Sequence, residues 1–152
     1  MLQIHFAQKE DVPEIQRLLK SADLPYSDIA EHIRHFIFVK HKSDIVGCVG
    51  LEIYEDIALL RSLAVEEKHR NRGLAKMLVQ GILQYAREQK ITKVFLLTTS
   101  ADRYFEKLSF KHVDRSTAPD AIQRTTQFTT LCPASAVLMY KELQEVQNQT
   151  VA

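Results

Sequence analysis

The segment from Arg70 to Ala75 carries the residues of this chain that are best suited to hold an anion. It precedes a stretch whose apolar residues recur at helical spacing, so its amides would lie at a helix N-terminus, where unpaired N–H groups and the helix dipole attract negative charge. Gly73 has no side chain to keep a phosphate away from the backbone, and Arg70 and Arg72 add positive charge. The segment predicts a phosphate site, with a plain polar helix cap as the alternative. It contains neither a Gly-Lys-Ser/Thr phosphate loop nor the Gly-x-Gly-x-x-Gly dinucleotide fingerprint.

A second candidate is a charge in an otherwise apolar strand. Strict alternation over residues 57–65 would place Arg61 on the same face as Leu59, Leu63 and Val65. An unpaired charge on such a face is costly. Arg61 could hold a substrate carboxylate or another oxyanion through both of its terminal nitrogens, pair with a structural Asp or Glu, or be turned to solvent by a bulge. The pattern leaves these alternatives open.

Strands and helices that would position these residues follow from the hydrophobic periodicity. Residues 36–65 read as three strands in an antiparallel meander, and the run 94–97 reads as a central strand covered on both faces. The other expected strands are 2–6, 110–113 and 135–140, and the expected helices begin near Asp11, Ser27, Leu74 and Ala101. Residues 114–130 resist assignment. The order predicts an α/β protein with a mixed sheet, in a single domain over residues 1–142 with a frayed tail at 143–152.

Composition narrows the function classes. The 152 residues include 20 Lys and Arg against 19 Asp and Glu, a balance that lacks the basic character of nucleic-acid binders. Two cysteines, Cys48 and Cys132, are too few for a disulfide framework or a thiolate zinc cage, and the histidines show no ligand spacing, so we expect no metal. No apolar run approaches the ~20 residues of a membrane span, and no signal peptide is visible. We therefore expect a cytoplasmic protein with no nucleic-acid or membrane partner.

Two motifs resemble those of the GCN5-related N-acetyltransferases (GNAT). The first is Arg70-x-x-Gly73-x-Ala75 after the strand Leu-Arg-Ser-Leu-Ala-Val of residues 60–65, and the second is Tyr-Phe-Glu-Lys-Leu-Ser-Phe of residues 104–110. The resemblance implies the GNAT fold, a mixed and mostly antiparallel sheet with flanking helices. It also implies an acyltransferase that uses acetyl-CoA as co-substrate to acetylate an amine.

The segments 96–100 and 131–137 are similar to those of bacterial N-acetyltransferases associated with arsenic resistance, and more distantly to the acetyltransferase domain of N-acetylglutamate synthases. Pro133 and Ala134 stand where those synthases have arginines implicated in holding glutamate. The resemblance thus implies a small amino-acid-like acceptor of the arsenic-resistance type. Glutamate or another amino acid remains an alternative acceptor, and an acyl-CoA-binding sensor without catalysis remains an alternative function. A homodimer is left open.

The resemblance also implies roles for the cofactor-binding residues. The pantetheine arm would insert between two splayed strands and pair with the main chain of the segment Leu63, Ala64 and Val65. Its pyrophosphate would be held by the amides of Arg70, Asn71, Arg72, Gly73, Leu74 and Ala75. A bulge near Ser62 or Leu63 would aim the Leu63 amide at the thioester oxygen, where negative charge develops.

For the acceptor, Glu52 is the carboxylate proposed to take a proton from the ammonium, with a solvent-facing strand residue as the alternative. The expected substrate-binding side chains are Arg61, Ser62, Thr98, Cys132 and Ser135. Cys132 would be a soft ligand for an arsenical, or else a small core residue.

The tyrosine that protonates the leaving thiolate in many relatives is replaced by Phe105, which would pack on the pantetheine arm or the sheet. Tyr104, its neighbour, points to a different helix face. We therefore predict catalysis without a tyrosine acid.

Overall fold

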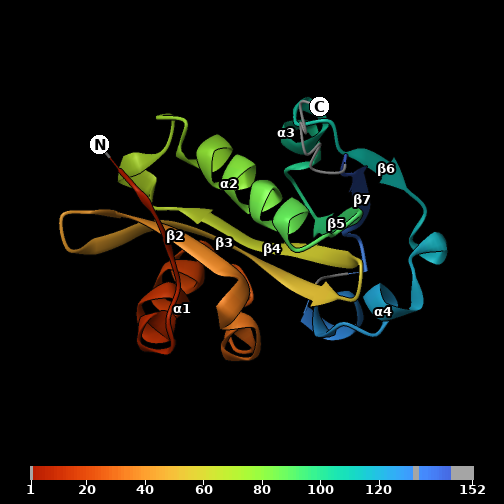
Figure 1. Ribbon diagram of the computed structural model, residues 1–152, viewed down its shortest axis with the longest axis horizontal. Coiled ribbons are helices and arrows are strands. Elements are labelled where there is room, and N and C mark those ends of the chain that lie inside the picture. The colour runs from red at the N-terminus through yellow and green to blue at the C-terminus, as the bar shows by residue number, and fades with distance from the viewer. Residues whose placement is uncertain (1, 132–133, 145–152) are drawn as a thin grey trace, which may run out of the picture.

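A computed structural model describes residues 2–131 and 134–144. These residues form a seven-stranded sheet in the order β1-β2-β3-β4-β5-β7-β6 (Figure 1). The strands are β1 (Ile4–Phe6), β2 (Phe36–His41), β3 (Asp44–Tyr54), β4 (Ile57–Val65), β5 (Lys93–Thr98), β6 (Lys111–Val113) and β7 (Val137–Glu142). The helices are α1 (Val12–Ser21), α2 (Leu74–Glu88), α3 (Asp102–Lys107) and α4 (Asp120–Gln123). Among the described residues, no helix has the length and apolarity to cross a membrane.

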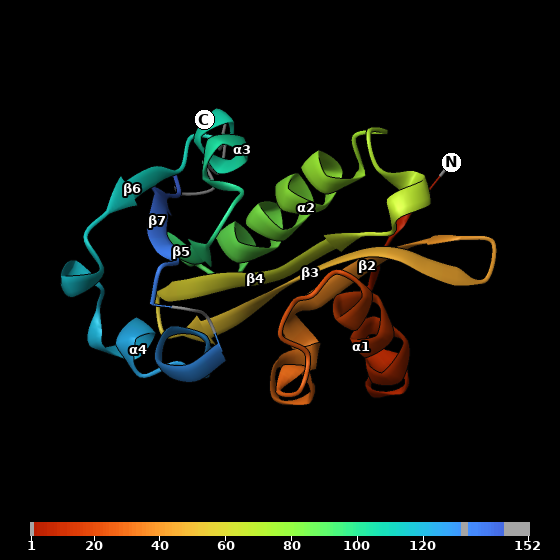
Figure 2. The same ribbon diagram turned by 180° about the vertical axis from the view of Figure 1, so that it is seen from behind.

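The sheet separates two layers of helices (Figures 1 and 2). α2 crosses one face, and α1 and the 3₁₀ helix Ile29–His35 cover the other. Leu78 and Ile82, one helical turn apart, are buried in the core cluster under α2, which also contains Leu60 of β4. Leu19 of α1 is buried in a second cluster on the opposite face. Both faces of the central strands are thus covered by apolar helix faces, as their continuous apolar sequences predict.

The strands β2, β3 and β4 form the predicted antiparallel meander. β4 and β5 are parallel, and residues 57–59 pair with residues 93–95. No pairing between the two strands occurs beyond Leu59 in the described chain, so β4 and β5 part toward their carboxyl ends. Because the main-chain groups on the facing edges lose their partners there, this opening can accept another extended chain.

A β-bulge interrupts β4 where the sequence predicts one. Cys48 pairs with Ala64 and Gly50 with Arg61, so Ser62 and Leu63 together lie opposite a single residue of β3. Ser62 adopts a left-handed conformation with φ of 63°. The extra residue reverses the alternation, because Arg61 then faces the α1 side of the sheet whereas Leu63 packs against the α2 cluster. The expectation that Arg61 shares a face with Leu63 and Val65 is therefore wrong.

Several local expectations change in detail. The turn expected to begin a helix at Ser27 forms the 3₁₀ helix Ile29–His35. Asp11 is the N-cap residue of α1 as predicted, but its carboxylate accepts a hydrogen bond from the Gln8 amide at 2.7 Å and makes no capping bond to α1. Leu143, placed in the tail by the sequence, is buried and its amide donates to the Thr92 carbonyl at 2.8 Å. The boundary at 142 and the frayed tail stay predictions, because residues 145–152 lie outside the described chain.

Gly50 is required by a close approach of β3 to an aromatic ring. A Cβ at this position would lie 2.3 Å from a ring carbon of Phe36, which is fully buried. We expect Gly50→Ala to lower the free energy of unfolding by about 1–3 kcal/mol, measured by urea denaturation. Gly81→Ala is the matched control, because its Cβ would meet the ends of two aliphatic side chains, Cδ1 of Ile4 at 2.7 Å and Cδ1 of Ile37 at 3.2 Å, which can move aside more easily than a buried ring. Equal stability of the Gly50→Ala variant and the wild type would contradict this packing.

Candidate active site

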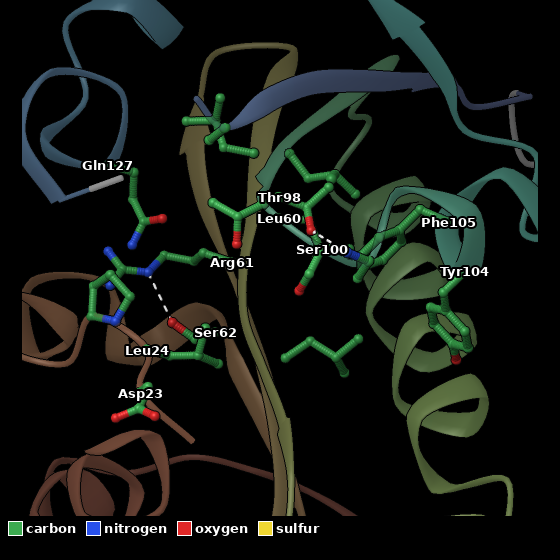
Figure 3. Close-up of a pocket in the computed structure, with 17 residues that line it drawn as sticks. Asp23, Leu24, Leu60, Arg61, Ser62, Thr98, Ser100, Tyr104, Phe105 and Gln127 are labelled. Atoms are coloured by element: carbon green, nitrogen blue, oxygen red, sulfur yellow. Dashed lines mark hydrogen bonds between the residues drawn. The ribbon is translucent and has the colours of Figure 1, made fainter. Parts of the chain in front are cut away.

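A cavity of about 330 Å³ lies where β4 and β5 part (Figure 3). Its walls come from β4, from the end of β5 and the loop after it, from α3, and from the turn after α1. The lining residues are Asp23, Leu24, Pro25, Leu60, Arg61, Ser62, Leu63, Leu96, Leu97, Thr98, Thr99, Ser100, Ala101, Tyr104, Phe105, Gln127 and Ala136. The cavity therefore brings together five residues that the sequence singled out: Arg61, Ser62, Leu63, Thr98 and Phe105.

The predicted phosphate loop forms a second cavity of about 340 Å³. Its lining consists of Val65, His69, Arg70, Asn71, Gly73, Leu74, Ala75, Lys76 and Tyr104. Gly73 is the N-cap of α2 with φ of 77°, and no described side chain caps the helix. The first-turn amides of α2 therefore remain available to an anion, and the lack of a Cβ leaves them exposed to it.

Arg70 differs from its expected role within this loop. Its amide donates to the Glu67 carbonyl at 3.3 Å, and its Nε donates to the Val65 carbonyl at 3.0 Å. The Nε bond ties the loop back to the end of β4, and the amide bond closes the 3₁₀ helix Glu67–His69, so Arg70 fixes the loop's shape and its amide has a protein partner. The amides proposed to hold a pyrophosphate therefore begin at Asn71.

Arg61 is at the centre of a buried ion-pair network on the α1 side of the sheet. Its two terminal nitrogens donate to both carboxylate oxygens of Asp28 at 2.7 and 2.6 Å, and Nη1 also donates to Glu52 Oε2 at 2.7 Å. Nε donates to Ser62 Oγ at 3.0 Å, which links the network to the bulge. Of the alternatives for Arg61, pairing with structural carboxylates is thus the one present.

The network shifts the pKa values of its members. Burial acts to raise the pKa of Asp28, but the hydrogen bonds and charge of Arg61 outweigh it and the pKa of Asp28 is lowered. Burial acts to lower the pKa of Arg61, yet Asp28 and then Glu52 raise it. Burial raises the pKa of Tyr54, and so does the hydrogen bond that its hydroxyl donates to Glu52. Arg61 and Asp28 therefore stay charged and Tyr54 stays neutral at neutral pH.

Glu52 does not have the surroundings of a proton acceptor for a substrate. It is 1% exposed, is not part of the cavity wall, and accepts hydrogen bonds from Arg61 and Tyr54. His32 Nε2 lies 3.6 Å from its Oε1. The expected role of base thus has no geometric support, and Asp23 is the carboxylate that borders the cavity.

Of the predicted acceptor-binding side chains outside β4, only Thr98 lies at the cavity within the described residues. Thr98 borders the cavity, and its hydroxyl accepts a hydrogen bond from the Ala101 amide at 2.9 Å. Ser135 is exposed and outside the cavity lining, although its neighbour Ala136 is part of that lining. Cys132 lies outside the described residues. Ala64, which the resemblance places beside the pantetheine arm, has its side chain in the core under α1.

Two aromatic residues of α3 border the cavity. Phe105 is 5% exposed and packs edge-on against Tyr104 and Phe110, with ring centroids 5.4 and 5.5 Å apart. It has no proton to donate. The sequence did not assign Tyr104, Asp23 or Gln127 to the site, because only the tertiary arrangement brings α3, the turn after α1 and Gln127 to β4.

Comparisons with known proteins agree with this geometry. A model of the acetyltransferase (GNAT) family matches residues 3–110. An uncharacterized N-acetyltransferase of Chlorobaculum tepidum is 33% identical over 107 residues, which are 70% of this chain and 66% of that protein. The amino-acid acetyltransferase of Pasteurella multocida is 23% identical over 77% of this chain and 29% of its own length. The chain thus spans less than two thirds of these relatives.

Among solved structures, the N-acetylglutamate synthase of Neisseria gonorrhoeae in complex with coenzyme A and N-acetyl-glutamate has a TM-score of 0.82. That match is 20% identical and covers 95% of this chain and 36% of the synthase chain. It confirms the predicted fold, a mixed sheet with flanking helices. The family model covers most of the described residues and establishes that the chain belongs to the acetyltransferase (GNAT) family, the family that the sequence motifs resemble.

Proposed function

We propose that this protein transfers the acetyl group of acetyl-CoA to the amine of a small, amino-acid-like acceptor. The observation that carries the proposal is the cavity between the parted ends of β4 and β5, which lies next to the uncapped N-terminus of α2. An extended thioester arm fits between the strands, and an anion fits at the helix. The cavity volume suits a small acceptor.

The roles proposed for this chain's residues follow from that arrangement. The amides from Asn71 to Ala75 would bind the pyrophosphate, and the main chain of Leu63 and Val65 would orient the arm. The bulge at Ser62 and Leu63 would direct an amide at the thioester oxygen as it gains negative charge. Acetyl-CoA supplies the activated acyl group.

Asp23 is proposed to attract the acceptor's ammonium to the cavity. A carboxylate is a much weaker base than an amine, so the proton would leave through water while Asp23 supplies charge. We expect Asp23→Asn to raise the acceptor KM about tenfold and to leave the acetyl-CoA KM unchanged, as measured by steady-state kinetics. Equal changes in both KM values would contradict this role.

The arsenic-resistance type of acceptor is the narrower form of the proposal. The two segments similar to that group of acetyltransferases, 96–100 and 131–137, both contribute to the cavity, the second through Ala136. The amino-acid acetyltransferase relatives and the synthase solved with N-acetyl-glutamate support an acceptor with an α-amino group. The departures at Pro133 and Ala134 argue against glutamate itself.

An acceptor screen tests the function. The protein is incubated with acetyl-CoA and glutamate, a phosphinic amino acid or an arsenical amino acid, and free thiol is measured with a chromogenic disulfide. We expect thiol release that depends on one of these acceptors, with the acetylated product seen by mass spectrometry. Binding of CoA without acceptor-dependent release across the screen would favour the sensor function.

A further inference from the structure

The hydroxyl of Tyr104 is a buried polar group without a hydrogen-bond partner among the described residues. A buried hydroxyl that lacks a partner destabilises a fold, so such a group calls for an explanation. Burial raises the pKa of Tyr104, which keeps the hydroxyl protonated at neutral pH. Tyr104 therefore presents an unused hydrogen-bond donor.

The position of Tyr104 is also distinctive. It lines both the cavity at β4 and β5 and the cavity of the loop before α2, and no other described residue lines both. Its ring is nearly perpendicular to that of Phe105, at an interplanar angle of 78°. Figure 3 shows the hydroxyl turned away from Phe105 and Ser100, toward α2. The donor thus lies where the cavity of the loop before α2, the proposed phosphate site, meets the cavity between β4 and β5.

We propose that Tyr104 is a cofactor-binding residue whose hydroxyl donates a hydrogen bond to an oxygen of the pantetheine arm of acetyl-CoA. This inference rests on the proposed function, since a molecule that joins the two cavities must pass Tyr104. An arm with amide carbonyl oxygens supplies the acceptor that the protein lacks at this point. The same position explains why Tyr104 does not replace the acid missing at Phe105, because its hydroxyl faces the phosphate loop.

The variant Tyr104→Phe removes the donor and keeps the ring. We expect the Kd of CoA, measured by calorimetry, to rise about tenfold, as for loss of one hydrogen bond that leaves its partner unpaired. Adenosine 3′,5′-bisphosphate lacks the pantetheine arm, so its Kd should be the same for variant and wild type. The melting temperature without ligand should not fall, because the hydroxyl has no hydrogen-bond partner to lose within residues 2–131 and 134–144.

Tyr140→Phe is the matched control, since it removes a hydroxyl from β7 outside both cavities. An unchanged Kd of CoA in Tyr104→Phe, or a Kd of the bisphosphate that rises equally, would overturn the inference. A hundredfold loss of kcat with unchanged Kd would instead make Tyr104 the acid and also overturn it. If wild-type protein binds CoA and releases thiol from acetyl-CoA only when an acceptor is present, the proposed function stands whatever Tyr104→Phe shows. If wild-type protein fails to bind CoA, both proposals fail.

Discussion

Replacement of Arg61 by methionine should lower the free energy of unfolding by about 3–5 kcal/mol, because it leaves the buried carboxylate of Glu52 and the partly buried carboxylate of Asp28 without their shared counter-charge. Asp28 and Glu52 both bind this guanidinium within 2.7 Å, and the Arg61 side chain is fully buried. Urea denaturation at neutral pH measures the loss. A change below 1 kcal/mol would contradict a structural role for the network.

The pH dependence provides an internal check on the same variant. In the wild type Asp28 has a lowered pKa, so its contribution is present above its unfolded pKa and is lost as the pH falls through the native value. Without Arg61 the effect of burial on Asp28 is no longer offset and its native pKa should rise instead, so the instability of Arg61→Met should shrink as the pH falls. The triple variant Asp28→Asn, Glu52→Gln, Arg61→Met removes all three charges and should recover much of the stability.

Gly73→Val should weaken CoA binding by about a hundredfold, which is the second large effect that we expect. Gly73 has φ of 77°, a conformation that β-branched residues strongly disfavour, and it lies at the helix N-terminus proposed to hold the pyrophosphate. No protein atom lies within 4 Å of a Cβ built there, so the side chain would project into the space proposed for the phosphate. Calorimetric titration with CoA measures the effect.

Gly73→Asn separates the effect of backbone strain from the effect of side-chain volume at the proposed phosphate site. Asparagine adopts left-handed φ values more readily than valine, so it adds a side chain with less strain. It should fold normally and bind CoA with an affinity between those of the wild type and Gly73→Val. Unchanged affinity in a folded Gly73→Val variant would show that the loop does not hold the phosphates.

Local patterns were sufficient to predict much of the fold. The meander over residues 36–65 follows from apolar runs separated by short polar turns, and α2 follows from apolar residues three and four apart. The residues 114–130 could not be assigned, because they form short helical segments whose buried anchors, such as Ile122, pack on distant strands. Such anchoring depends on tertiary contacts that no short window contains.

Within the site, the sequence identified residue types more reliably than roles. Arg61 and Glu52 were both singled out as charges on strands, yet they bind each other, and Asp28, which completes the network, lies 33 positions before Arg61 in the chain. The bulge also reverses the face of every residue beyond it, which strict alternation does not foresee. From the sequence, Tyr104 is considered only as a replacement for the missing acid and not as a ligand-binding residue, because only the tertiary structure buries its hydroxyl beside two cavities.

Hydrogen–deuterium exchange with and without CoA tests the central claim most directly, since it reports where the ligand contacts the main chain. Slower exchange on CoA binding is predicted for amides in two segments, residues 62–65 of β4 and residues 71–75 before and within the first turn of α2. The amides of α1, on the opposite face of the sheet, should be unaffected. Protection confined to other segments, or no protection at saturating CoA, would contradict the proposed acetyl-CoA site.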